Sequence, residues 1–181
     1  MRTRDVRRAC HARLAGLRER GLVLPRPFDA EELSRRVGAC LGRPVTLIAM
    51  PMPSGAPYGV TLFTDDGHIV AYEERTSRFH QGLIIAHELG HILFDHRTVA
   101  LDDDQASQLL MPALRPTLVR QVVGRTGVYS RREEREAETM ATVLIEESGR
   151  EADDGEPAVA LRPDDVELYD RLRGSFEHPD R

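Results

Sequence analysis

The chain has 181 residues and a formal net charge of -5, with 40% hydrophobic and 30% charged residues. This size fits one domain, or one domain with an appendage, and the composition is that of an ordinary globular protein. An acidic chain is a poor candidate for a general nucleic-acid-binding protein, because such proteins are usually basic. No run approaches the roughly 18 apolar residues that a membrane helix needs, and the charged start lacks the apolar core of a secretory signal. We therefore expect a cytoplasmic protein that makes no membrane contact.

The first part of the chain predicts two helices followed by a small sheet. Apolar residues at helical spacing predict a helix over Arg4–Arg20. A second helix is predicted from Asp29, the N-cap of a capping box, to Leu41. Short apolar runs between turn residues predict strands over Val45–Ala49, Tyr58–Phe63 and His68–Tyr72. Because an Asp-Gly hairpin signal separates the last two, we expect a three-stranded, mainly antiparallel sheet.

The second part predicts mainly helices. The segment Ser77–Phe94 is apolar nearly all round, which is typical of a buried helix. Further helices are predicted between Asp104 and Gly124 and from Ser130 to Glu147. The expected fold class is therefore α+β, with the sheet packed on the buried helix. We expect residues 1–148 to form this domain and residues 149–181 to form an acidic linker and a short C-terminal helix.

The segment His87–His91 reads HELGH, the HExxH pattern of zinc peptidases. On a helix, residues four apart differ by about 40° around the axis, so both histidines share one face. They can reach a single zinc ion at roughly 2.0–2.1 Å. Glu88 is rotated by about 100° from His87, which places it beside the metal as the general base. Burying ionisable groups in the most apolar helix of the chain costs free energy unless they bind a metal or another partner. This favours a metal site over a pair of surface histidines.

A third protein ligand would complete a site with one position open for water and substrate. The extended form of the motif needs a histidine six residues after His91, but Arg97 stands there, so His96 is not the expected ligand. Glu134 fits better, because it shares 3–4 spacing with the apolar face of the predicted helix Ser130–Glu147.

Several residues near the predicted ligands are candidates for supporting roles. Glu138, one turn after Glu134, can orient a ligating histidine by accepting its second N–H. Glu138 and Glu136 also stay open as alternative third ligands, although helix geometry points Glu136 elsewhere, onto a surface laced with arginines. Tyr129 and Tyr58 are candidates to stabilise an oxyanion, but a partly buried structural tyrosine is the more common case.

Two motifs carry a resemblance to a known family. They are HELGH at His87–His91 and E-R-E-A-E at Glu134–Glu138, and they are similar to the motifs of the ImmA/IrrE family of metallo-endopeptidases. The family's second motif usually reads E-x-E-A-N/D-x-F-A, so here Glu138 replaces Asn or Asp and Met140 replaces Phe. The resemblance covers roughly residues 45–145.

The resemblance implies a zincin-like fold, a bound Zn²⁺ and peptide hydrolysis. Such proteins are usually encoded beside a helix-turn-helix repressor of the Xre type, which they cleave, often in stress responses. We therefore predict a zinc metallo-endopeptidase whose partner is such a repressor. The alternative is a non-catalytic zinc-binding protein that regulates by binding a repressor or an antitoxin. Direct nucleic-acid binding is not expected, because no helix-turn-helix pattern was found.

Overall fold

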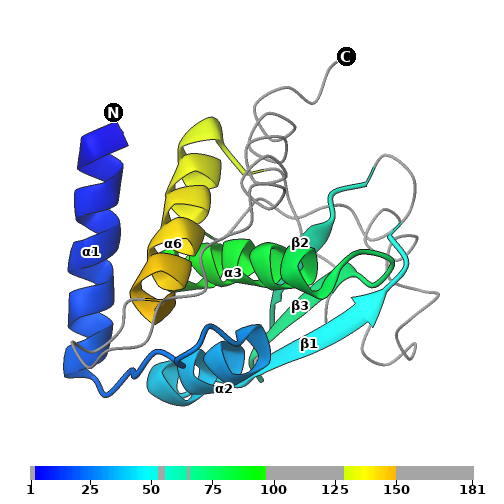
Figure 1. Ribbon diagram of the computed structural model, residues 1–181, viewed down its shortest axis with the longest axis horizontal. Coiled ribbons are helices and arrows are strands. Elements are labelled where there is room, and N and C mark those ends of the chain that lie inside the picture. The colour runs from blue at the N-terminus through cyan, green and yellow to red at the C-terminus, as the bar shows by residue number, and fades with distance from the viewer. Residues whose placement is uncertain (1–2, 53–55, 65, 97–128, 150–181) are drawn as a thin grey trace. The chain divides into compact units, whose positions relative to one another are not determined.

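The computed structural model describes residues 3–52, 56–64, 66–96 and 129–149. The chain divides into two compact units, Met1–Ser148 and Gly149–Arg181, and the fold described below is that of the first. The helix predicted between Asp104 and Gly124, the linker and the C-terminal helix lie outside the described residues. The described elements give an α+β fold, as expected: helices α1 (Thr3–Glu19), α2 (Ala30–Leu41), α3 (Arg78–Phe94) and α6 (Arg131–Gly149), and strands β1 (Val45–Met50), β2 (Gly59–Phe63) and β3 (His68–Glu73) (Figure 1).

The sheet is mixed, which corrects the expectation of a mainly antiparallel one. Its strand order is β1-β3-β2, with β2 and β3 antiparallel and β1 and β3 parallel. The predicted hairpin between β2 and β3 is present, closed by a hydrogen bond from Thr64 N to Gly67 O. The connection from Met50 to Gly59 is too long and proline-rich to be a tight turn. β2 follows β1 in the chain but does not pair with it in the sheet, and β3 lies between them as the parallel neighbour of β1.

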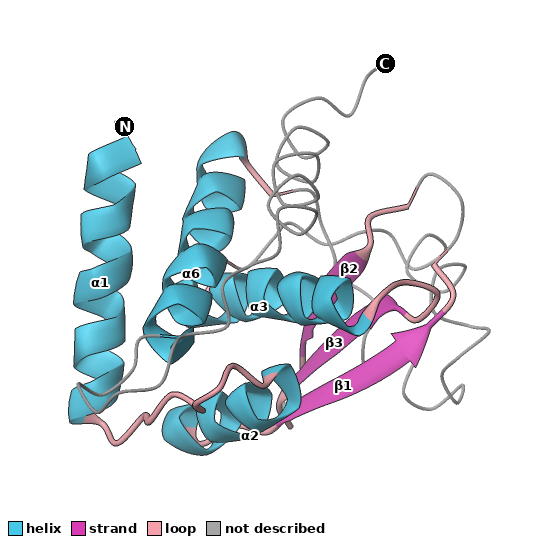
Figure 2. Ribbon diagram, viewed as in Figure 1, coloured by secondary structure: helices cyan, strands magenta, loops and turns pink. Residues whose placement is uncertain are grey.

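Two helices cover the strands. Helix α3 packs on β2 and β3, and α2 packs on β1 and against α3 (Figure 2). The core between them is mainly aliphatic, because only 5% of the residues are aromatic. Its fully buried side chains include Leu62, Val70, Leu89 and Leu93. A helix buried on most of its circumference is the environment predicted for the HELGH segment.

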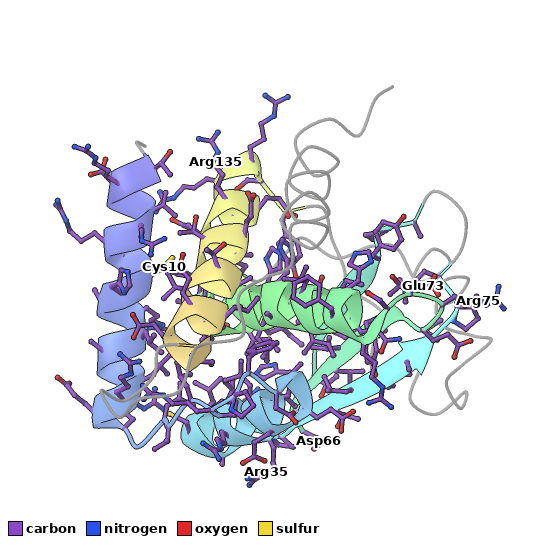
Figure 3. The ribbon with its side chains drawn as sticks, viewed as in Figure 1. Cys10, Arg35, Asp66, Glu73, Arg75 and Arg135 are labelled. Atoms are coloured by element: carbon purple, nitrogen blue, oxygen red, sulfur yellow. The ribbon has the colours of Figure 1, made fainter. Side chains whose placement is uncertain are left out.

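Helix α1 contacts both α3 and α6. It buries one apolar stripe, as the helical spacing of its apolar residues predicts. Cys10 lies on the side of α1 that faces α6, and its thiol donates to Glu136 O at 3.8 Å (Figure 3). Arg13 Nε donates to Leu93 O at 2.6 Å, near the C-terminal end of α3. This contact satisfies one of the carbonyls that a helix end leaves without an internal partner. The stripe consists of Val6, Cys10, Leu14 and Leu17.

Polar side chains cap the N-terminal ends of α2, α3 and α6. Asp29 Oδ1 accepts from Glu32 N at 2.8 Å, and Ser77 Oγ accepts from the backbone N–H of α3 at 3.1 Å. Ser130 and Glu133 form a reciprocal capping box, in which each side chain accepts from the other's backbone N–H. These caps provide partners for backbone N–H groups that a helix start leaves without an internal acceptor.

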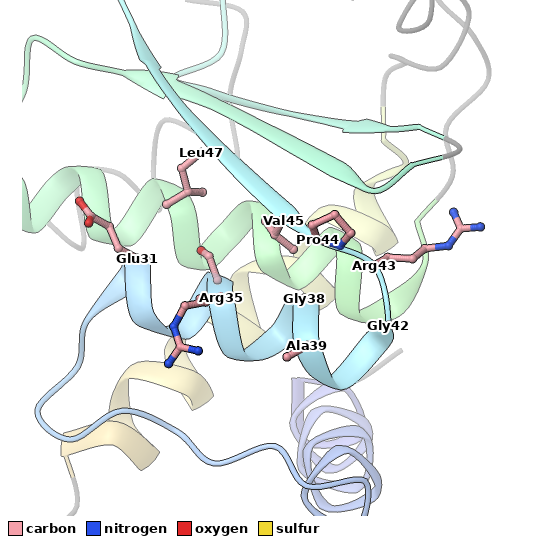
Figure 4. A pocket seen from close by; sticks show the side chains of 10 residues that line it. Glu31, Arg35, Gly38, Ala39, Gly42, Arg43, Pro44, Val45 and Leu47 are labelled. Carbon is pink, nitrogen blue, oxygen red and sulfur yellow. The ribbon is translucent and has the colours of Figure 1, made fainter.

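An open groove of about 390 Å³ lies between α2 and β1. Glu31 and Arg35 of α2 and Leu47 of β1 are among the side chains that line it (Figure 4). No residue of the HELGH segment borders it, so this groove is separate from the candidate site. None of the described helices has both the length and the apolar content needed to cross a bilayer.

Candidate metal centre

His87, His91 and Glu134 form a group that can hold a metal ion. The Nε2 atoms of the two histidines lie 3.0 Å apart. Glu134 Oε2 lies 3.3 Å from His87 Nε2 and 3.9 Å from His91 Nε2. Two ring nitrogens and a carboxylate oxygen therefore converge on one point, with the histidines supplied by α3 and the carboxylate by α6.

A glycine allows the two helices to approach this closely. A Cβ atom at Gly90 would lie 2.7 Å from Ala137 O and 2.8 Å from Ala137 Cα. Real Cβ atoms do not come so close to backbone, so only glycine fits at this crossing. Gly90 lies between the two histidines in sequence, and Ala137 lies one turn after Glu134. The HELGH glycine therefore brings the α6 carboxylate within reach of the α3 imidazoles.

The electrostatics of the group favour a bound cation. Burial, together with His87 and His96, holds the pKa of His91 far below its usual value, so this ring is neutral, as a metal ligand must be. Burial also lowers the pKa of His87, but Glu134, Glu88 and Glu138 outweigh it, and the net pKa is raised. The carboxylates around His87 thus create a negative potential that stabilises positive charge at this place.

Glu88 lies beside the group, turned towards β2. Its side chain is buried, and Thr61 Oγ1 donates to its Oε2 at 2.6 Å. A Cβ at Gly59 would lie 2.7 Å from Glu88 Oε1, so the glycine leaves room for the carboxylate. Burial raises the pKa of Glu88 above the usual glutamate value, while His87 and Thr61 oppose the shift. Thr61 and Gly59 were not expected at the site, because no local pattern links β2 to the motif.

Tyr129 covers one face of His91. The two rings stack with centroids 3.5 Å apart and planes 14° from parallel. Burial, with Glu88 and Glu134, raises the pKa of Tyr129, so its hydroxyl keeps its proton and stays a hydrogen-bond donor. An oxyanion stabiliser needs such a donor. That role for Tyr129 stays a prediction, whereas its packing on His91 is a feature of the structure.

Glu136 is buried, so its predicted place on an exposed surface is wrong. Its Oε2 accepts from His96 Nε2 at 3.2 Å, and its Oε1 accepts from Arg132 Nε at 3.0 Å. His96 in turn contacts His91, with 3.1 Å between their Nδ1 atoms. The residue that contacts the second nitrogen of His91 is therefore His96, for which the sequence predicts no such role.

A signal for Glu136 was present in the sequence. Glu136, Met140 and Val143 follow 4–3 spacing and are all buried. The prediction for Glu134 rests on a neighbouring stripe of the same helix, which begins at that residue. Both stripes face the interior, because α6 is enclosed by α1 on one side and α3 on the other. The proposed orienting role of Glu138 stays a prediction, and its charge is among those that raise the pKa of His87.

Comparisons with protein-family models, with the sequences of curated proteins and with solved structures gave no match.

Proposed function

We propose that the protein is a zinc-dependent metallo-endopeptidase with a zincin-like arrangement of its helices. The observation that carries this proposal is the convergence of His87, His91 and Glu134 beside the buried carboxylate of Glu88. In a tetrahedral site with bonds of 2.0–2.1 Å, neighbouring ligand atoms lie about 3.3 Å apart. The separations of 3.0, 3.3 and 3.9 Å bracket that value. Two imidazoles and a carboxylate are also a donor set that zinc favours.

Each residue has a distinct part in the proposed hydrolysis. A bound zinc ion would polarise the scissile carbonyl and lower the pKa of a water molecule towards about 7. Glu88 takes the proton of the attacking water and then donates it to the leaving amine. A carboxyl group whose pKa burial has raised holds that proton long enough to deliver it. Thr61 holds the carboxylate in place between the two transfers.

The proposed substrate follows from the resemblance described above. Its motifs at His87–His91 and Glu134–Glu138 are similar to those of peptidases that cleave Xre-type repressors. A repressor substrate places the activity in the cytoplasm. This part of the proposal is tested by adding the purified protein to a candidate repressor and identifying new termini by mass spectrometry.

Substitution of Glu88 separates metal binding from catalysis. Glu88→Gln keeps the size of the side chain but removes the base, so it should retain zinc and lose hydrolysis by about 10²- to 10⁴-fold. Glu134→Ala should lose most of the zinc, because only two protein ligands remain. Zinc content is measured by mass spectrometry, and hydrolysis with a peptide library. Wild-type activity in Glu88→Gln would overturn the mechanism.

One observation favours the alternative of a zinc-binding protein that does not hydrolyse peptides. Glu88 is only 5% exposed and is already hydrogen-bonded to Thr61. If the protein does not hydrolyse peptides, the wild-type protein would bind zinc, cleave no peptide in the library, and still bind a repressor or antitoxin. The same preparations therefore decide between the two functions.

A further inference from the structure

His91 has a second polar contact, on the side of its ring away from Glu134. Its Nδ1 lies 3.1 Å from His96 Nδ1, and both side chains are buried. His96 reaches this position because α3 ends at Phe94, two residues earlier. Asp95 adopts a left-handed conformation with φ 56°, and His96 N donates to His91 O at 2.9 Å. The end of α3 thus turns the chain back and places His96 against His91.

His96 is held from its other side by α6. Its Nε2 lies 3.2 Å from Glu136 Oε2, and Arg132 Nε donates to Glu136 Oε1 at 3.0 Å. The ring also stacks on Phe94, with centroids 5.4 Å apart and planes 9° from parallel. With two polar contacts and a ring contact, the His96 imidazole has a fixed orientation. The contacts form a continuous chain from His91 through His96 to Glu136.

The chain of contacts allows one assignment of protons when Nε2 of His91 is a ligand. A neutral histidine that binds through Nε2 carries its proton on Nδ1. That N–H donates to Nδ1 of His96, which must then be the acceptor. His96 carries its own proton on Nε2 and donates it to Glu136. The opposite assignment would put a proton on Nε2 of His91, where the metal has to bind.

We propose that His96, held by Glu136, is a positioning residue that fixes the ring and the tautomer of His91 for metal binding. The inference rests on the metal site of the proposed function and adds two residues to it. Outer hydrogen bonds of this kind orient a ligand, and their loss typically weakens metal affinity by about 10- to 100-fold.

Two substitutions of His96 test its two polar contacts separately, because each variant can keep only one of them. In His96→Asn, the side-chain oxygen can still accept from His91, but the contact with Glu136 is lost. In His96→Gln, the longer amide can reach Glu136 but no longer offers an acceptor at the position of Nδ1. We expect His96→Gln to weaken zinc binding by about 10- to 100-fold, and His96→Asn to retain more of the affinity. Zinc affinity is measured by competition with a chromophoric chelator, after circular dichroism has shown that each variant is folded.

A matched pair of substitutions on α6 gives the control. Glu136→Ala removes the same contact as His96→Asn and keeps the acceptor at His96 Nδ1, so it should weaken zinc binding less than His96→Gln does. Glu146→Ala removes an exposed glutamate of the same helix and should leave the affinity unchanged. If His96 had only a structural role, the zinc affinities of the variants would follow their stabilities and not the contacts that they keep. Wild-type affinity in His96→Gln and in Glu136→Ala would overturn the inference.

The outcomes also separate this inference from the proposed function. If the wild-type protein takes up no zinc, both fall together. If it binds zinc and the variants bind equally well, only the positioning role falls. If the affinities follow the expected order but the wild-type protein cleaves no peptide, the peptidase proposal falls and the positioning role stands.

Discussion

The Glu88 carboxylate is held by a hydroxyl group from a different element. Thr61 is buried on β2, and its hydroxyl donates to Glu88 Oε2 at 2.6 Å, while Oγ1 lies 3.3 Å from the Glu88 backbone carbonyl oxygen. A hydrogen bond to a charged group contributes about 1.5–3 kcal/mol, and a buried acceptor that loses its donor pays a desolvation cost. The bond therefore stabilises the ionised form of Glu88, which is the form that accepts a proton.

Substitution of Thr61 tests this role. Thr61→Val keeps the branched shape but removes the hydroxyl, so we expect kcat/KM for a cleaved peptide to fall by about 10- to 100-fold. Zinc content should not change, because Thr61 does not contact a proposed ligand. Thr61→Ser is the matched control, since it restores the donor and should recover most of the activity. Equal rates in Thr61→Val and wild type would show that Glu88 needs no such support.

At the scale of residues, the sequence predicted what depends on local spacing. His87 and His91 lie on one face of a helix because they are four residues apart, and Glu134 converges on them as expected. The roles of Glu136 and His96 could not be read in the same way. Glu136 is buried because α1 covers that side of α6, and His96 contacts His91 because the chain turns at the end of α3. Both causes are tertiary contacts.

At the scale of elements, the crossing of α3 and α6 decides whether the site can form. The crossing point is Gly90 against the backbone of Ala137, which is fully buried. An added methyl group there has no flexible side chain to displace, because its nearest neighbours are backbone atoms. The helices would have to separate, and Glu134 would move away from the histidines.

Gly90→Ala should therefore destabilise the fold and weaken zinc binding together. Overpacking of a buried contact costs about 1–3 kcal/mol, which exceeds the gain of up to about 1 kcal/mol from replacing glycine in a helix. Gly16→Ala on α1 is the control, because a Cβ at Gly16 meets nothing within 4 Å and only the helical gain should be seen. Urea unfolding of the metal-free proteins gives the stabilities. A Gly90→Ala variant as stable as Gly16→Ala would contradict the close crossing.

The sheet shows why pairing is harder to predict than the strands themselves. The three apolar runs form β1, β2 and β3, each within one residue of its predicted bounds. The Asp66-Gly67 turn signal correctly joined β2 to β3. No sequence pattern near β1 specifies its partner. That pairing depends on which of the two hairpin strands, β2 or β3, lies beside β1 in the folded sheet. Strand identity is a local property, whereas strand order is a property of the assembled fold.

At the scale of the whole molecule, the proposed ligands lie on elements far apart in the chain. His87 and His91 belong to α3 and Glu134 to α6, and residues 95–130 separate these helices in the sequence. The ion pairs Arg7–Glu146 and Arg18–Glu147 link α1 to α6, but both arginines are about 40% exposed. Such surface pairs contribute about 0–1 kcal/mol each. A metal bound by α3 and α6 would add a stronger cross-link than these pairs.

Zinc should therefore raise the thermal stability of the whole domain. A ligand that binds only the folded state at about 1,000 times its Kd stabilises that state by about 4 kcal/mol. For a chain of this size, this corresponds to a rise in Tm of about 8–16 °C. The rise should disappear with a chelator and be largely absent in Glu134→Ala, but persist in Glu146→Ala. If Glu134→Ala kept the full shift, the cross-link between α3 and α6 would not exist, because two histidines on one helix join nothing beyond that helix.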